Sequence, residues 1–499
     1  MGNIGFLPIA PEIVLLVGAV VVLMVEVTLR LGRRAWGLVS GATLAMAFAF
    51  SVLQWMRVRE LGPQLNFSQR DIESIRLPMV VMDGLSAFTG LVLFAAAALA
   101  LVGAWRLVAS LETRGAEFVA LYLLAVAGLH VMAISSNLVL LFIGLETASI
   151  SLYVIAGFTR EQERSDEAAM KYFLLGSFAS AVFIYGVALT FAATGSTSIY
   201  GAGGIQSFLQ NTAILRPGIA LTGLALMIVG LGFKVSAAPF HQWAPDVYQG
   251  APAGAVPMMA AGVKIAGFAA LARILVSAFP ALIDSWAPPL SALAALSIVV
   301  GTLVAIAQDD LKRMLAYSGV AHAGFIMTGL VAGLGGVPAV EFYVATYAFQ
   351  LIGAFTVVAI VSGPRSDRSG FHAFVGLGTR SPFLAWMLAL FMLAMGGIPF
   401  TAGFVAKIGV FTAAVDAGYL WLAILGLVTA VAGLFFYLRI IVLMFFQQSV
   451  LAEAPGTATA PPEVATGARV VLAVASAVTV AIGIVPWPLL NFVGDALPL

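Results

Sequence analysis

Long apolar runs separated by short polar breaks recur along the whole chain. Each run has about 20 residues or more, which is the length an α-helix needs to cross a bilayer. The runs predict fourteen spans, near 9–29, 35–56, 78–108, 117–134, 137–158, 168–194, 214–240, 251–279, 286–307, 311–333, 338–362, 381–415, 418–446 and 468–490. The overlong spans at 78–108 and 381–415 require tilt, additional turns or a break. We therefore predict an all-α polytopic membrane protein with about 14 transmembrane helices.

Proline and glycine residues predict where two of these helices break. Pro239 closes the seventh span and Pro399 interrupts the twelfth. Broken helices at corresponding places in two halves indicate inverted repeats around an ion site at mid-membrane depth. Spans four to eight and nine to thirteen are five each, and an odd number gives the halves opposite topology. We expect three N-terminal helices in 1–115, the first repeat in 116–280, the second in 281–447, a cytoplasmic linker in 448–467 and a last helix in 468–499.

Basic residues in the connections predict the orientation, because they favour the cytoplasmic side. With the N-terminus outside, the inner connections hold Arg30, Arg33, Arg34, Arg106, Arg114, Arg160, Arg164, Lys171, Lys312, Arg313, Arg365, Arg368, Arg380, Arg439 and Arg469. The outer connections hold Arg57, Arg59, Arg70, Arg76, Arg216 and Arg273. We therefore predict a multi-pass protein of the cell membrane with both termini on the outer, positive side. The first span carries Glu12 and Glu26 without a preceding basic segment, so we interpret it as retained and not as a signal peptide.

Composition narrows the chemistry further. Apolar residues make up 62% of the chain and charged residues 9%, and there is no cysteine, which excludes disulfides and iron–sulfur clusters bound by this chain. The four histidines are too scattered to indicate a metal site, and we find no glycine-rich phosphate-binding motif. No basic cluster indicates nucleic acid. We therefore expect no cofactor in this chain, and an energy supply from an ion gradient or a partner subunit.

The three remaining basic residues, Lys234, Lys264 and Lys407, lie inside apolar runs. A lysine at mid-bilayer costs at least ~2.5–3.5 kcal/mol on insertion scales. Snorkelling to the headgroups is the alternative for a lysine near a span end. Snorkelling is hard for Lys264, because twelve residues precede it in its span. It is more plausible for Lys407, and also for Lys234 if the helix of Lys234 ends at Pro239. We interpret the three lysines as functional.

Glu146 is a fourth charged group within an apolar run, ten residues into its span. It could form a hydrogen bond between helices. Alternatively, a carboxylate within about 4–6 Å of a lysine holds the proton on that lysine, and moving the carboxylate lets the proton leave. We therefore predict a proton switch in which Glu146 sets the proton affinity of Lys234.

Other polar residues are weaker candidates. His322 lies eleven residues into the tenth span among small residues, and is either a proton relay or a structural histidine. His241, followed by Asp246, either tethers a loop or carries protons. Lys171 is either an interfacial anchor or a proton input group. We assign His130 and His372 structural roles, and none to Glu26.

Four stretches closely resemble the N-subunit family of bacterial NADH–quinone oxidoreductase, respiratory complex I. They are "DEAAMKYFLLGSFASAVFIYG" (166–186), "FKVSAAPFHQWAPDVYQGAPAGAVPMMAAGVK" (233–264), "DDLKRMLAYSGVAHAGF" (309–325) and "GIPFTAGFVAKIGVF" (397–411). The resemblance is most specific from Ser135 to Lys264 and least distinctive in the first three spans and the tail.

The resemblance implies fourteen helices, two inverted five-helix repeats and broken seventh and twelfth helices. It implies a proton path through Glu146, Lys234, Lys264, His322 and Lys407, with Lys171 in the input region. NADH, flavin, iron–sulfur clusters and quinone would be bound by partner subunits, and neighbouring antiporter-like subunits are expected partners, together with the lipid bilayer.

Two functions remain open at this point. One is a proton-pumping membrane-arm subunit of complex I, and the alternative is an Mrp-like cation/proton antiporter driven by an ion gradient. The stretch 166–264 favours the first. Four buried charges disfavour a purely structural scaffold.

Overall fold

The computed structural model describes residues 5–30, 32–66, 69–70, 76–159, 162–211, 217–363, 369–447 and 462–499. Its main elements are α1 (Ala10–Leu29), α2 (Arg33–Leu61), β1 (Gln64–Asn66), β2 (Gln69–Arg70), β3 (Arg76–Leu77), β4 (Val80–Met82), α3 (Gly84–Ser110), α4 (Gly115–Ile134), α5 (Leu138–Ala156), α6 (Glu163–Thr194), α7 (Ile205–Asn211), α8 (Gly218–Lys234), α9 (Trp243–Gly250), α10 (Val263–Ala272), α11 (Ile283–Ile306), α12 (Leu311–Leu330), α13 (Val337–Ser362), α14 (Leu377–Arg380), α15 (Pro382–Gly396), α16 (Ala402–Asp416), α17 (Leu420–Phe445), α18 (Thr466–Ile484) and α19 (Trp487–Gly494). Most of the predicted linker (448–461) and Arg160, Arg216, Arg365 and Arg368 lie outside the described residues.

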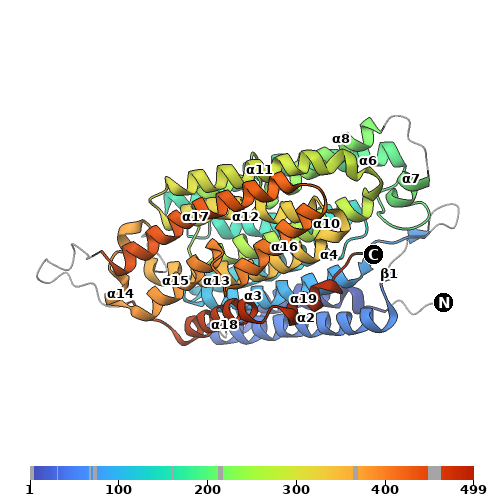
Figure 1. The fold of residues 1–499 in the computed structure, drawn as a ribbon. Coiled ribbons are helices and arrows are strands. Elements are labelled where there is room, and N and C mark those ends of the chain that lie inside the picture. The colour runs from blue at the N-terminus through green and yellow to red at the C-terminus, as the bar shows by residue number, and fades with distance from the viewer. Residues whose placement is uncertain are drawn as a thin grey trace, which may run out of the picture.

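The long helices run side by side in one elongated bundle (Figure 1). Eleven helices of the described residues are long and apolar enough to cross a membrane. The other three predicted spans are the two broken helices, α8 with α9 and α15 with α16, and α12, which begins with the charged pair Lys312 and Arg313. The predicted all-α fold with fourteen spans is therefore confirmed, and so are the broken seventh and twelfth helices.

Several span boundaries differ from those predicted. The span predicted from residue 78 begins with β4, which pairs with β1, and its helix starts only at Gly84. The seventh helix ends at Lys234, not at Pro239. The last span ends at Ile484, and a separate short helix, α19, follows. Each difference lies at the edge of an apolar run, where hydrophobicity alone does not distinguish a helix end from a strand or a turn.

Asparagine and aspartate residues begin three of the spans. Asp83 accepts a hydrogen bond from the backbone of Ser86 at the start of α3, and Asn137 and Asp310 cap α5 and α12 in the same way. These side-chain oxygens satisfy N–H groups that have no partner within the helix.

The two five-helix repeats share their close packing. In the first, α4 and α5 approach at Gly128, where an added Cβ would lie 2.5 Å from the backbone nitrogen of Ala148. In the second, α11 and α12 approach at Gly301, where an added Cβ would lie 2.3 Å from the backbone nitrogen of Ala321. Small residues allow helix backbones to approach this closely in a membrane. In each repeat, the first two helices are thus packed closely at a glycine.

Both ends of the described chain lie at the same end of the bundle, on the right in Figure 1. The backbone N–H of Leu499 donates to Asp83 Oδ2 at 3.0 Å, and Gln54, near the end of α2, donates to the carbonyl of Leu7 at 2.8 Å. We call this the Leu499 end, and the opposite end, where α12 begins, the Arg313 end.

The protein buries more charge than the four groups that the sequence indicated. Among the described residues, the additional buried charged side chains are Glu12, Asp83, Arg273, Lys312 and Glu341. Glu146, in contrast, is half-buried. The interpretation of Arg273 as a residue of an outer connection was wrong, because it begins a π-helical turn (Arg273–Ala278) after α10 and is 0% exposed.

Arg273 and Asp83 form a buried ion pair that joins distant helices at the Leu499 end. Nη1 and Nη2 of Arg273 donate to the two carboxylate oxygens at 2.7 and 3.0 Å. Arg273 also donates to Tyr200 Oη and to the carbonyl of Ala133. The pair neutralises both charges and satisfies their polar atoms, which a buried charge requires.

We expect Asp83→Asn to destabilise the protein by about 3–5 kcal/mol, because the guanidinium would then be buried without a counter-charge. Asparagine retains the acceptor that caps α3, so the loss would report on the charge. A lower melting temperature of the membrane-extracted protein checks this expectation. The control is Asp416→Asn, at an exposed aspartate. Equal melting temperatures for the two variants would contradict it.

Candidate functional site

Lys234 is the last residue of α8 and lies inside the bundle with 4% of its surface exposed. Its Nζ lies 5.4 Å from the ring centre of Tyr153 and 5.6 Å from that of Tyr172. Aromatic faces attract a cation, and so does the C-terminal end of a helix. The ammonium is therefore stabilised without a direct hydrogen bond, since Nζ has no partner in the described part of the protein.

Glu146 lies on α5 near Lys234 but does not bond to it. Its Oε1 accepts a hydrogen bond from Ser180 on α6. Glu146 acts on Lys234 only through a Coulomb interaction. The two side chains therefore interact through their charges and share no hydrogen bond.

Lys264, on α10, reaches the break in the seventh helix. Its Nζ donates to the carbonyl of Val235 at 2.6 Å. Val235 directly follows Lys234, where α8 ends and carbonyl groups have no partner in the next turn. The break therefore brings two lysines together. Lys234 ends the helix, and Lys264 donates to the carbonyl of the next residue.

Lys407, on α16, reaches the break in the twelfth helix in the same manner. Its Nζ donates to the carbonyls of Met395 and Gly396 at 3.0 and 2.8 Å, and lies 5.0 Å from the ring centre of Phe325. These carbonyls form the C-terminal end of α15. Each repeat thus directs the end of a broken helix at a buried ammonium, which is a recurring way to bind a cation in transporters.

Both breaks contain a strained backbone residue that is not glycine. Ser236 has φ +62° and Phe400 has φ +67°. This left-handed conformation costs on the order of 1–3 kcal/mol for such residues and is common where a site must change state. Ser236 and Phe400 are therefore strained positions beside the buried lysines, whereas Arg30 and Glu112, the other described non-glycine residues with positive φ, lie at helix ends away from them.

His322 lies in the middle of α12 between the two repeats' lysines. Its Nδ1 is 2.8 Å from Tyr343 Oη and its Nε2 is 3.1 Å from Tyr437 Oη. The ring stacks on Tyr347, with 4.2 Å between ring centres. The imidazole therefore sits in a chain of phenol groups, and Coulomb interactions couple it to Lys264 and Lys407.

Lys171 lies apart from this group, at the Arg313 end. Its side chain is 41% exposed and pairs with Glu167 at 2.6 Å and with Asp246 at 2.9 Å. Arg313 bonds to the other oxygen of Asp246 at 2.5 Å. A polar cleft of about 240 Å³ opens among these side chains.

Within the described residues, His130 and His241 form no hydrogen bond with the buried lysines or with His322. His130 is 2.5 Å from Glu12 in a buried pair between α1 and α4. His241 contacts the ring of Tyr317, and its Nδ1 has no hydrogen-bond partner within the described residues. Glu26 accepts a hydrogen bond from Trp36. In the described part of the chain, no group of acidic and histidine side chains is arranged to hold a metal ion.

The phenols and the backbone carbonyls of the site were not predicted from the sequence. Tyr153, Tyr172, Tyr343, Tyr347 and Tyr437 surround the charged groups, and tyrosine in an apolar span was the available signal. No sequence signal identifies the acceptor carbonyls, because they depend on where each helix ends.

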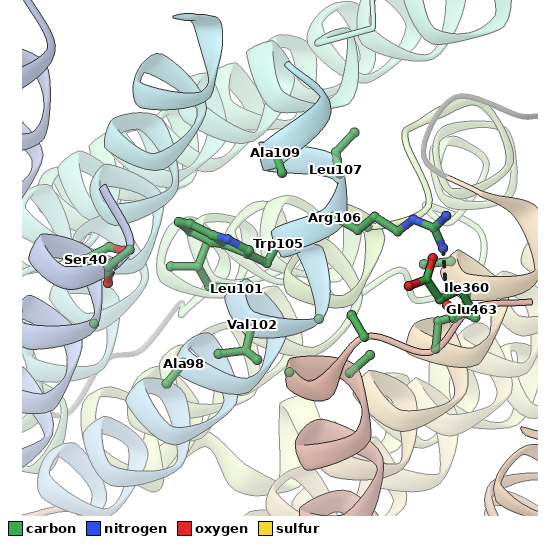
Figure 2. A pocket seen from close by; sticks show the side chains of 18 of the residues that line it. Ser40, Ala98, Leu101, Val102, Trp105, Arg106, Leu107, Ala109, Ile360 and Glu463 are labelled. Carbon is green, nitrogen blue, oxygen red and sulfur yellow. Dashed lines mark hydrogen bonds between the residues drawn. The ribbon is translucent and has the colours of Figure 1, made fainter. Parts of the chain in front are cut away.

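A second cleft, of about 460 Å³, is lined by neither Glu146, the three buried lysines nor His322. It lies between α2, α3 and the start of α18 and is lined mainly by apolar side chains such as Leu101, Val102 and Trp105 (Figure 2). Arg106 points toward Glu463 at its rim and donates to the carbonyl of that residue at 3.3 Å. Because this cleft does not contact the buried lysines or His322, we assign the cleft no part in the site.

Comparisons with known proteins agree on one family. The family described as "NADH:quinone oxidoreductase/Mrp antiporter, TM" matches residues 135–433. NADH-quinone oxidoreductase subunit N of Trichlorobacter lovleyi is 40% identical over 84% of this chain and 85% of its own length. Subunit N 1 of Solibacter usitatus is 38% identical over 97% of this chain and 95% of its own length.

Solved structures share the fold. A chain of respiratory complex I from Thermus thermophilus is 32% identical, with a TM-score of 0.79 over 98% of this chain and 100% of that one. A chain of the Mrp complex from a Dietzia species is 22% identical, with a TM-score of 0.83 over 99% and 97%, and it shows a common fold alone. On its sequence and its fold, this antiporter-like membrane protein belongs to the NADH-quinone oxidoreductase subunit N family.

Proposed function

We propose that this chain is a proton-translocating membrane-arm subunit of NADH–quinone oxidoreductase. Protons would cross along the axis of Glu146, Lys234, Lys264, His322 and Lys407. The observation that carries the proposal is that two buried ammonium groups, Lys264 and Lys407, each donate to backbone carbonyls at the end of a broken helix. Such carbonyls stabilise the charged form of lysine and can be withdrawn by a small movement.

The proposed step at Lys264 and at Lys407 is the gain and loss of one proton. With its carbonyl acceptors in place, the lysine is charged. When the break moves and the acceptors leave, desolvation favours the neutral amine, and the proton passes on. The strained residues Ser236 and Phe400 support this role for the breaks.

Glu146 would set the proton affinity of Lys234 at a distance. A carboxylate favours a charged lysine through the Coulomb interaction, and the interaction weakens if the carboxylate takes up a proton or moves. Ser180 donates a hydrogen bond to Glu146, which favours the ionised carboxylate that this interaction requires.

His322 would relay protons between the repeats. A histidine can accept a proton at one ring nitrogen and release one at the other, and both nitrogens here face a phenol. The phenols of Tyr343 and Tyr437 both donate and accept hydrogen bonds, which suits them to pass a proton on.

Lys171 would belong to the input region and not to the axis itself. Together with Asp246 and Arg313 it lines a polar cleft at the Arg313 end. We propose that this end faces the cytoplasm and that both termini face the outer, positive side, as the distribution of basic residues indicates.

The driving reaction would take place in other subunits. NADH, flavin, iron–sulfur clusters and quinone would be bound there, and this chain would receive the energy through neighbouring membrane-arm subunits, including antiporter-like ones. Residues 116–280 and 281–447 would form the two repeats, with 1–115 and 468–499 packed against them.

We expect the chain to be recovered from native membranes within a large assembly that contains flavin and iron–sulfur subunits. Flavin fluorescence, iron content and NADH-driven acidification of vesicles check this expectation. Recovery of the chain as a lone, stable protein that exchanges cations for protons without NADH would contradict it and would support the Mrp-like alternative.

A further inference from the structure

A buried glutamate beyond the axis has no role in the function proposed so far. Glu341 lies one turn into α13, near the Leu499 end, and is 1% exposed. Its Oε1 has no hydrogen-bond partner in the described part of the protein. A carboxylate in such a place is costly unless a cation compensates it.

The cation close to Glu341 is already neutralised. Arg273 acts on Glu341 through a Coulomb interaction, but it makes both of its carboxylate hydrogen bonds to Asp83. Its other donors reach Tyr200 and the carbonyl of Ala133. One cation thus faces two carboxyl groups, and Asp83 holds it in a bidentate pair. The second carboxyl group, Glu341, is therefore expected to carry a proton at rest.

Glu341 lies on the Leu499 side of the axis. On α13, Tyr347 and Tyr343 contact His322, and Glu341 is six residues from Tyr347, or about 9 Å nearer the start of the helix. Arg273 follows Lys264 by nine residues in the same helical run, toward the same end.

The helix packing places Lys407 at nearly the same depth in the bundle as Glu341. An added Cβ at Gly329 on α12 would contact both Val340, which precedes Glu341, and Val410, one turn after Lys407. An added Cβ at Gly409 would contact Ala339. Glu341 thus stands between the last groups of the axis and the Leu499 end of the bundle.

We propose that Glu341 is the proton carrier on the output side of the axis. This inference rests on the proposed function. Glu341 releases its proton toward the Leu499 end, and the carboxylate that remains is held by the field of Arg273 until a proton arrives from Lys407 or from the His322–Tyr343 pair. One proton enters and one leaves in each cycle, and no other reactant is needed.

The test compares Glu341→Gln with Glu341→Asp in the assembled complex, with proton pumping and NADH oxidation as readouts. Glutamine keeps the size and the neutrality of the protonated acid but cannot release a proton. We expect Glu341→Gln to lower pumping by half or more at normal complex abundance, and Glu341→Asp to restore part of it with an altered pH profile. The control is Glu12→Gln, at a buried glutamate away from the axis, and it should pump normally.

Normal pumping in Glu341→Gln, alongside reduced pumping in Lys234→Ala, would overturn the inference and leave the proposed function standing. Normal pumping in both variants would overturn the proposed function. If Glu341→Gln fails to assemble, Glu341→Asp decides, because an unaltered pH profile in that variant would also overturn the inference.

Discussion

Lys407→Arg is expected to lower proton pumping several-fold in complex assembled at normal abundance. Arginine retains a positive charge and can still donate to the carbonyls of Met395 and Gly396. It does not release its proton in a protein, however. If Lys407 supplied only a fixed charge, the variant would pump almost normally. Proton translocation per NADH oxidised, in sealed vesicles, measures the difference.

The matched control is Lys312→Arg. Lys312 is also buried and also donates to a backbone carbonyl, that of Ala251, but it lies at the Arg313 end and outside the axis. We expect this variant to pump normally. Wild-type pumping in Lys407→Arg would show that Lys407 is not a proton carrier. An equal loss in both variants would assign the effect to the size of the guanidinium.

Lys234→Ala is expected to abolish most proton pumping and, through coupling, to slow quinone reduction. The substitution removes the charge on which Glu146 acts, at the residue that precedes Val235, the acceptor of Lys264. Glu146→Gln should act in the same direction with a smaller effect, because it removes only the charge that holds the proton on Lys234. The rates of NADH oxidation and of vesicle acidification check both variants.

Glu26→Gln serves as the control for the carboxylate. Glu26 is also half-buried and accepts a hydrogen bond from another side chain, that of Trp36, but it is on α1, away from the axis. It should leave pumping unchanged. Undiminished pumping in Lys234→Ala would show that protons do not pass through Lys234. Equal effects of Glu146→Gln and Glu26→Gln would show that Glu146 does not specifically set the proton affinity of Lys234.

The fold could be predicted from the sequence because membrane insertion is decided locally. Every span must satisfy its own backbone and be apolar over its own length, so each apolar run predicts a helix independently of the others. The breaks near Pro239 and Pro399 are also local, since proline cannot continue a helix hydrogen-bond ladder. Lys234, Lys264 and Lys407 could also be identified locally, because a lysine within an apolar run has a high cost of insertion whatever its neighbours are.

Only the tertiary structure decided what these groups contact. The acceptors of Lys264 and Lys407 are carbonyls at helix ends on other segments, and the two phenols bonded to His322 come from α13 and α17. Which helix faces which depends on the packing of segments that are far apart in the chain, and an apolar run does not encode it.

The ends of the apolar runs were the least predictable part. From the sequence, Arg273 was assigned to an outer connection and Glu341 was assigned no role. The sequence does not distinguish a charged side chain that reaches the headgroups from one that contacts a neighbouring helix, when both lie near the end of a span. The cost of such a side chain depends on whether a partner such as Asp83 lies beside it. The sequence by itself therefore determined the helices, their breaks and the charged residues within them, whereas the tertiary structure decided which charges are paired and which remain available to carry a proton.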